Sequence, residues 1–83
     1  MNTLQEANSL INGDRKDSYG DIYDNSRRII DMFNNIAGTN LKPEHYPLFM
    51  VCVKLVREGH SHKRDNIVDL EGYMELYNQI VEF

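Results

Sequence analysis

The sequence of 83 residues predicts an all-α domain, a compact bundle of four helices. Apolar residues recur at three- and four-residue spacing in four segments, and Gly, Pro or capping residues bound these segments. A hydrophobic content of 41% with 27% charged residues is typical of a globular protein. We expect a single helical domain over residues 1–83. A domain this small buries only about 60% of its unfolded surface, so we also expect a homo-oligomer.

The first helix is predicted at about residues 3–12. Thr3 and Glu6 have the spacing of a capping box, in which each side chain bonds the backbone N–H of the other residue. Gly13 follows the narrow apolar stripe and is suited to end the helix.

The second helix is predicted at about residues 22–37, with Asp21 as its N-cap and Gly38 at its end. Its apolar side chains gather on one half of the helical wheel. Asn25 and Ser26 also project into that half, so we expect them to face the fourth helix.

The third helix is predicted at about residues 43–58, with Pro43 as its first residue and Gly59 at its end. Apolar side chains surround almost its whole circumference, which is typical of a central helix. The valines also allow a strand, but the segment length and the neighbouring helices favour a helix. Cys52 lies between two valines, so we expect a buried thiol in a reducing compartment.

The fourth helix, at about residues 64–82, has polar residues within its apolar face. At 100° per residue, Asn66 falls in the middle of that face and Asp69 just inside its edge, with Asp65 one turn before Asp69. An unpaired buried polar group costs about 1–3 kcal/mol. We therefore expect these three side chains to point inward toward partners, and Gly72 on the same line to allow close helix packing or ligand approach.

Three interpretations of this inward polar face remain open. The carboxylates of Asp65 and Asp69 either pair with Lys54 or Arg15 in a structural network, or hold a metal or phosphate group, or recognise another ligand. Lys54 itself either meets those carboxylates or extends to water. The candidate residues of this ligand site or polar network are Arg15, Tyr19, Asp21, Asn25, Lys54, Asp65, Asn66, Asp69 and Tyr73.

The loop before the second helix combines Arg15, Tyr19 and turn glycines. It lacks the Gly-x-x-x-x-Gly-Lys-Ser/Thr spacing of a phosphate loop, so it is either a structural tether or a ligand contact. His60 and His62 precede a helix that Ser61 is suited to cap, which favours solvent-exposed histidines over a metal cluster with Asp65. We assign no catalytic residue and no metal site.

The formal net charge of −4 and pI of about 5.2 argue against direct binding of nucleic acid. The first residues lack the basic start and apolar run of a signal peptide, and no apolar run approaches the ~18 residues of a membrane span. We expect a cytoplasmic protein without a membrane partner.

These motifs resemble a family of small helical proteins encoded by phages and prophages. The matching pieces are Arg15-x-x-x-Tyr19-Gly20-Asp21, Asn25, Lys54-Leu55-x-Arg57 and His62-Lys63-Arg64-Asp65-Asn66-x-Val68-Asp69-x-x-Gly72-Tyr73. The resemblance covers most of the chain and implies a phage accessory protein in the bacterial host cytosol, without implying a reaction.

A more distant similarity is to the MazG-like all-α nucleoside triphosphate pyrophosphatases, which hold magnesium between acidic helices. The Glu-Glu-x-x-Glu-type helix of those enzymes is absent, and Asp21, Asp24, Asp65 and Asp69 form a thin ligand set. We therefore expect a cofactor-free accessory protein that binds a host or phage protein, with inhibition of a host enzyme or defence system as one form of that activity. The alternative is a nucleotide-binding protein or a magnesium-dependent nucleotide pyrophosphatase.

Overall fold

A computed structural model describes residues 2–12 and 22–82, and these ranges contain helices but no strand. The helices are α1 (Thr3–Asn12), α3 (Ile22–Ala37), α4 (His45–His60) and α5 (Arg64–Val81). The predicted all-α fold with four helices is confirmed. The predicted bounds agree within two residues at each helix end. No helix in the described ranges is long and apolar enough to cross a membrane.

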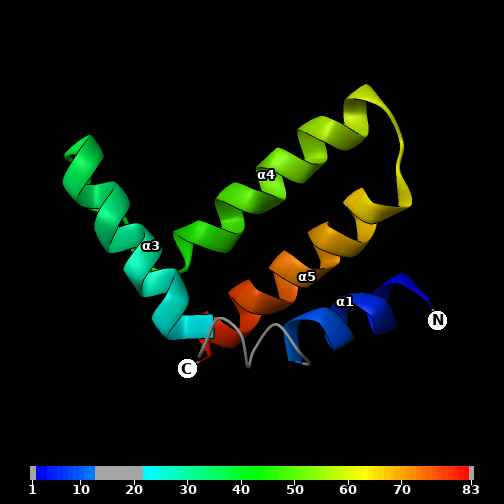
Figure 1. The fold of residues 1–83 in the computed structure, drawn as a ribbon, viewed down its shortest axis with the longest axis horizontal. Helices are drawn as coiled ribbons and strands as arrows, with labels where there is room; N and C mark the ends of the chain where they lie inside the picture. The colour runs from blue at the N-terminus through cyan, green and yellow to red at the C-terminus, as the bar shows by residue number, and fades with distance from the viewer. Residues whose placement is uncertain (1, 13–21, 83) are drawn as a thin grey trace.

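The centre of the fold is α5 and not the third predicted helix. Figure 1 shows α4 and α5 running antiparallel, with α1 on the other side of α5. α5 also contacts α3, so three helices pack against it. Its buried residues are Asn66, Val68, Gly72, Leu76 and Ile80. α4 packs mainly against α5 and less closely against α3, and its Cys52 is exposed, so the expectation of a buried thiol is wrong.

α4 begins and ends two residues later than predicted. Pro43 lies in a turn, where its carbonyl accepts the Tyr46 N–H at 3.1 Å, and the Lys42 N–H donates to Nδ1 of His45 at 2.8 Å. Pro47 is tolerated near the helix start because a proline there has no helical N–H to lose. Gly59 lies within the helix, which continues to His60.

The ends of α1 and α5 are built differently from the predicted caps. At α1 the reciprocal pair is Asn2 and Gln5: Gln5 N–H donates to Asn2 Oδ1 at 2.7 Å, and Asn2 N–H donates to Gln5 Oε1 at 3.1 Å. The capping pattern thus starts one residue before Thr3. At α5 the N-cap is Lys63, in extended conformation, and not Ser61.

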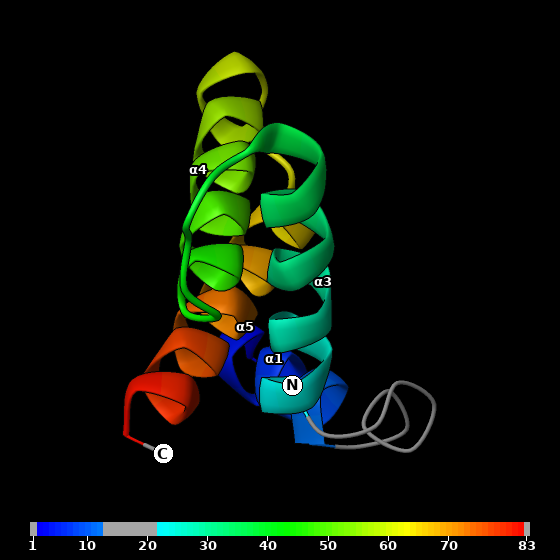
Figure 2. The same cartoon turned by 90° about the vertical axis from the view of Figure 1, so that its left-hand side faces the viewer.

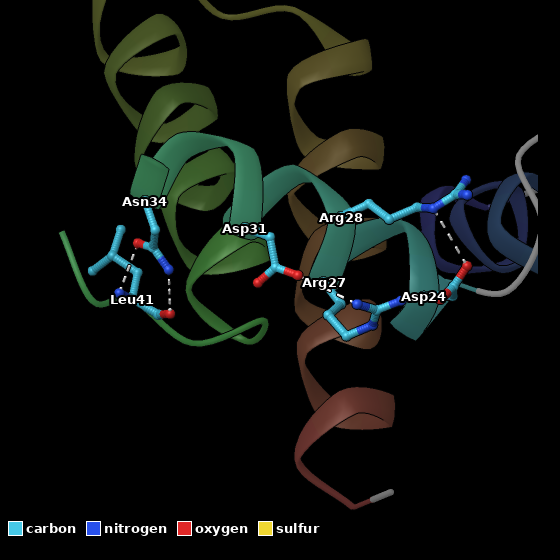
Figure 3. A network of polar contacts seen from close by, with 6 residues as sticks. All are labelled: Asp24, Arg27, Arg28, Asp31, Asn34 and Leu41. Carbon is cyan, nitrogen blue, oxygen red and sulfur yellow. Dashed lines mark hydrogen bonds and ion pairs between the residues drawn. The ribbon is translucent and has the colours of Figure 1, made fainter. Parts of the chain in front are cut away.

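Asn34 fixes the connection between α3 and α4. Its amide nitrogen donates to the Leu41 carbonyl at 3.0 Å, and its amide oxygen accepts from Leu41 N–H at 2.9 Å (Figure 3). The same oxygen also accepts from the Thr39 hydroxyl at 2.8 Å. Gly38 ends α3 with φ of +70°, a left-handed conformation that favours glycine. Figure 2 shows the connector turning back from the end of α3 toward the start of α4.

α3 is the least enclosed helix of the described ranges. Ser26 and Ile30 are buried, but α3 packs much less against α4 and α5 than those two helices pack against each other. Figure 1 shows α3 and α4 starting at the same end and diverging toward their C-termini. On the polar side of α3, Arg27 lies 2.9 Å from Asp24 and 3.3 Å from Asp31 (Figure 3).

Candidate functional site: a polar network between α4 and α5

The centre of the network is an ion pair between the antiparallel helices α4 and α5. Lys54 Nζ on α4 lies 2.9 Å from Asp69 Oδ2 on α5. The Lys54 side chain is 12% exposed and that of Asp69 30% exposed. An ammonium withdrawn this far from water needs a charged partner, and Asp69 provides it.

Asn66 and Glu58 form a second cluster where α4 turns into α5. Asn66 is 7% exposed, and its amide nitrogen donates to Glu58 Oε1 at 3.2 Å. The same oxygen accepts the Lys63 N–H at 3.0 Å, while Glu58 Oε2 contacts Nδ1 of His62. The bond with His62, followed by that with the Lys63 N–H, lowers the pKa of Glu58 below its ordinary value of 4.5. Glu58 therefore ties the end of α4 to the start of α5.

Tyr73 lies further along α5 and contacts Tyr46 near the start of α4. The ring centroids are 6.0 Å apart and the ring planes meet at 86°, an edge-to-face arrangement. Glu58 and Tyr46 were not among the predicted site residues. For Glu58 the i,i+4 spacing to His62 was an available signal.

On the side toward α1, α5 makes polar contacts over long sequence separations. The Thr3 hydroxyl donates to Glu71 Oε1 at 3.0 Å, and Arg64 pairs with Glu6, which raises the Arg64 pKa. Glu71 Oε2 is buried and has no hydrogen-bond partner within residues 2–12 and 22–82.

Gly72 faces α1. A Cβ built on Gly72 would lie 3.8 Å from Ala7 Cβ, which is ordinary van der Waals contact. The helices therefore approach closely at Gly72, but a methyl group fits between them.

The structure brings together only part of the predicted set. Lys54 meets Asp69, and Asn66 bonds Glu58 instead of approaching Asn25, which is half-buried on α3. Asp65 is exposed, so its predicted inward orientation is wrong. Its angle around the helix is close to that of the buried Gly72, but Asp65 is the second residue of α5, and at this end of the helix the side chain on that line is exposed. Arg15, Tyr19 and Asp21 lie outside the described residues.

This network consists of a direct ion pair between Lys54 and Asp69 and the neighbouring hydrogen bond between Asn66 and Glu58. The Lys54 ammonium already lies against the Asp69 carboxylate, where a divalent cation would have to bind. Within the described ranges no three His, Cys, Asp or Glu side chains are grouped to hold a metal ion. A half-buried pair of this kind fixes the register of two helices, because shifting either helix would leave a charge without its partner.

Beside this network α5 carries an apolar stripe. Met74 and Val81 on it are 42% and 49% exposed, and the other members are half-buried. We define the outer ridge of α5 as Ile67, Leu70, Met74, Tyr77 and Val81. Their spacing of three and four residues places them on one stripe of the helix. The ridge is presented by the helix against which the other three pack.

Comparisons with known proteins match nearly the whole chain. A family described as "Domain of unknown function (DUF6378)" matches residues 2–81. The chain is 32% identical to the Gene 55 protein of Mycobacterium phage L5 over 75 residues, which is 88% of this chain and 48% of that protein. It is 29% identical to the Gene 55 protein of Mycobacterium phage D29 over 80 residues, covering 95% of this chain and 53% of that protein.

The chain thus spans about half the length of these curated relatives. No solved structure matches it. The relatives agree with the predicted resemblance to a family of phage proteins, whereas they give no support to the similarity with the MazG-like pyrophosphatases.

Proposed function

Because the chain belongs to the family described as "Domain of unknown function (DUF6378)" and its relatives are bacteriophage proteins, we propose that it is an accessory protein that acts by binding another protein. The partner is a host or phage protein in the bacterial cytosol. Inhibition of a host enzyme or defence system is the form of activity that we expect from such binding.

The observation that carries this proposal is the outer ridge of α5. A row of apolar side chains along a partly exposed helix face is the form in which an amphipathic helix binds in a groove of another protein. The Lys54–Asp69 pair and the Asn66–Glu58 cluster hold α5 against α4, so the ridge is preorganised and loses little conformational entropy on binding. Because the chain carries a net charge of −4, the complementary surface on the partner has an apolar groove with a basic rim.

The test compares three forms of the full chain as bait in a bacterial host lysate: wild type, Met74→Glu and Leu4→Glu. Met74 lies on the outer ridge, whereas Leu4 is 65% exposed on α1 and serves as the matched control for an added carboxylate. We expect a protein retained by wild type and by Leu4→Glu but lost with Met74→Glu. Titration calorimetry with that purified protein should then show the same order of affinities.

Two results contradict the proposal. In the first, Met74→Glu retains the same proteins as wild type. In the second, the chain releases pyrophosphate from a nucleoside triphosphate in the presence of magnesium and Asp69→Asn abolishes this activity, which identifies the enzymatic alternative. That alternative requires a cation to replace Lys54 at the Asp69 carboxylate.

A further inference from the structure

The described residues expose more large apolar side chains than they bury. Five apolar residues form the buried core, and eleven large apolar residues are exposed. A domain of this size buries only a small apolar area, so its stability as a single chain is low. Most of the exposed apolar residues lie on α3 and α4, away from the outer ridge of α5.

On α3 the exposed apolar residues form one stripe, which we call the α3 stripe: Ile29, Met32, Phe33 and Ile36. Their spacing of three, one and three residues places all four on the same helix face, as in the seam of a coiled coil. Ile36 near the end of α3 is 78% exposed, and the stripe contains no charged residue. Nothing within the described ranges covers this stripe.

On α4 a second stripe lies opposite the face that carries Lys54. This α4 stripe consists of Phe49, Cys52 and Val56, all exposed, and Val56 is 74% exposed. Figure 1 shows that α3 and α4 diverge over the halves of the helices that contain Ile36 and Val56, so neither stripe is covered by the other helix.

We propose that a second copy of this chain packs on the α3 and α4 stripes and forms a two-fold symmetric dimer. In such a dimer each chain contributes its diverging α3 and α4, and the two pairs together enclose a four-helix core. A two-fold contact uses the same surface on both copies, so an uncharged stripe with coiled-coil spacing is suited to meet its own copy.

The available area agrees with a stable dimer. The exposed fractions in the two stripes are together equivalent to more than three fully exposed large residues. At about 150–200 Å² each, this is about 650 Å² per chain, above the largest apolar patch of many monomers and close to the roughly 800 Å² per partner of a standard interface.

The charges of α3 permit this contact although the whole chain is acidic. α3 contains two acidic and two basic residues, and Arg27 pairs with Asp24 and Asp31 within the helix. Two copies that meet through α3 therefore do not bring together an excess of like charge. This distinguishes the α3 stripe from the acidic remainder of the chain.

The experiment measures the mass of the full chain by sedimentation equilibrium over a range of concentrations. Wild type should sediment as two chains at roughly 100 μM, and Ile36→Glu should raise the dissociation constant by at least about tenfold, because the carboxylate enters the contact twice. Leu4→Glu adds the same charge outside both stripes and should leave the dissociation constant unchanged. Cys52 provides a second readout, because alkylation of this thiol should slow as wild type is concentrated but not as Ile36→Glu is concentrated.

A wild-type chain that stays monomeric overturns the proposal. The proposal also fails if Leu4→Glu weakens the dimer as much as Ile36→Glu does. Circular dichroism of both variants shows whether each remains helical. The dimer uses α3 and α4, whereas the proposed function uses the outer ridge of α5. A monomer that still loses its partner with Met74→Glu therefore refutes only the dimer, and a dimer with no such partner refutes only the proposed function.

Discussion

Breaking the Lys54–Asp69 pair from each side should have unequal effects on the free energy of unfolding. Asp69→Asn leaves an ammonium on a side chain that is 12% exposed, whereas Lys54→Met leaves a carboxylate that is 30% exposed and reaches water more easily. Removing one partner of a fully buried pair costs about 3–5 kcal/mol, and removing one of a surface pair about 0–1 kcal/mol. For these intermediate exposures we expect losses of about 2 kcal/mol for Asp69→Asn and about 1 kcal/mol for Lys54→Met.

The assay is urea unfolding followed by circular dichroism at one fixed protein concentration, so that self-association contributes equally to every variant. The double variant Lys54→Met with Asp69→Asn should be less destabilised than the sum of the single variants, with a coupling of about 1–2 kcal/mol. The melting temperature of Asp69→Asn should fall by roughly 8–16 °C. If both single variants unfold like wild type and the coupling is zero, the pair does not hold α4 and α5 in register.

Three further changes test other parts of the fold. Gly72→Ala should raise the free energy of unfolding by about 0.5–1 kcal/mol, measured by urea unfolding, because alanine favours a helix and its Cβ meets Ala7 at an ordinary distance. Glu58→Gln should flatten the loss of stability in acid, measured by melting temperature against pH. Since folding lowers the Glu58 pKa, its contribution is complete above the ordinary value of 4.5 and is lost as the pH falls through the lower folded value. Asn34→Ala should cost about 1–2 kcal/mol by removing the bonds to Leu41, again measured by urea unfolding.

For each of these three predictions, one result would contradict it. A destabilised Gly72→Ala would mean that the α1–α5 approach has no room for a methyl group. If the melting temperature of Glu58→Gln falls in acid as steeply as that of wild type, other carboxylates cause the acid sensitivity. For Asn34→Ala the control is Asn35→Ala on the exposed side of α3, and equal effects of the two variants would show that the bonds to the connector contribute nothing.

The helices were predictable because local rules determine them. Periodic apolar residues and glycines place α1, α3 and α5 almost residue by residue, and the two-residue displacement of α4 follows from the turn at Pro43. The helical wheels of the four segments did not predict that α5 is the central helix, because a wheel shows how apolar a helix face is but not which element covers it. Cys52 illustrates this limit: its neighbours are apolar, but the partner of its own face is absent from the described part of the chain.

The network was predictable only where a buried charge demanded a partner. The position of Asp69 at the edge of an apolar face indicated a cation on a neighbouring helix, and Lys54 was one of the two candidates named. Asn66 has several possible partners of similar chemistry, and the choice of Glu58 depends on how α4 turns into α5. Asp65 shares its line on the helical wheel with the buried Gly72 but lies in the first turn of α5, and the wheel does not show how far along a helix the neighbouring helices cover it.

The contacts between α1 and α5 also determine the order in which the chain can assemble. α4 and α5 are neighbours in the sequence, so their hairpin closes a short loop, whereas Thr3 and Glu71 are 68 residues apart. Contacts between residues so far apart in the sequence form late in folding, because closing the long loop costs conformational entropy before the contacts can stabilise the fold. During synthesis α1 emerges well before α5, the helix on which it packs. Among the described helices α1 packs on α5 alone, so in the folded protein the amides of α1 should exchange with solvent faster than those of the α4–α5 hairpin.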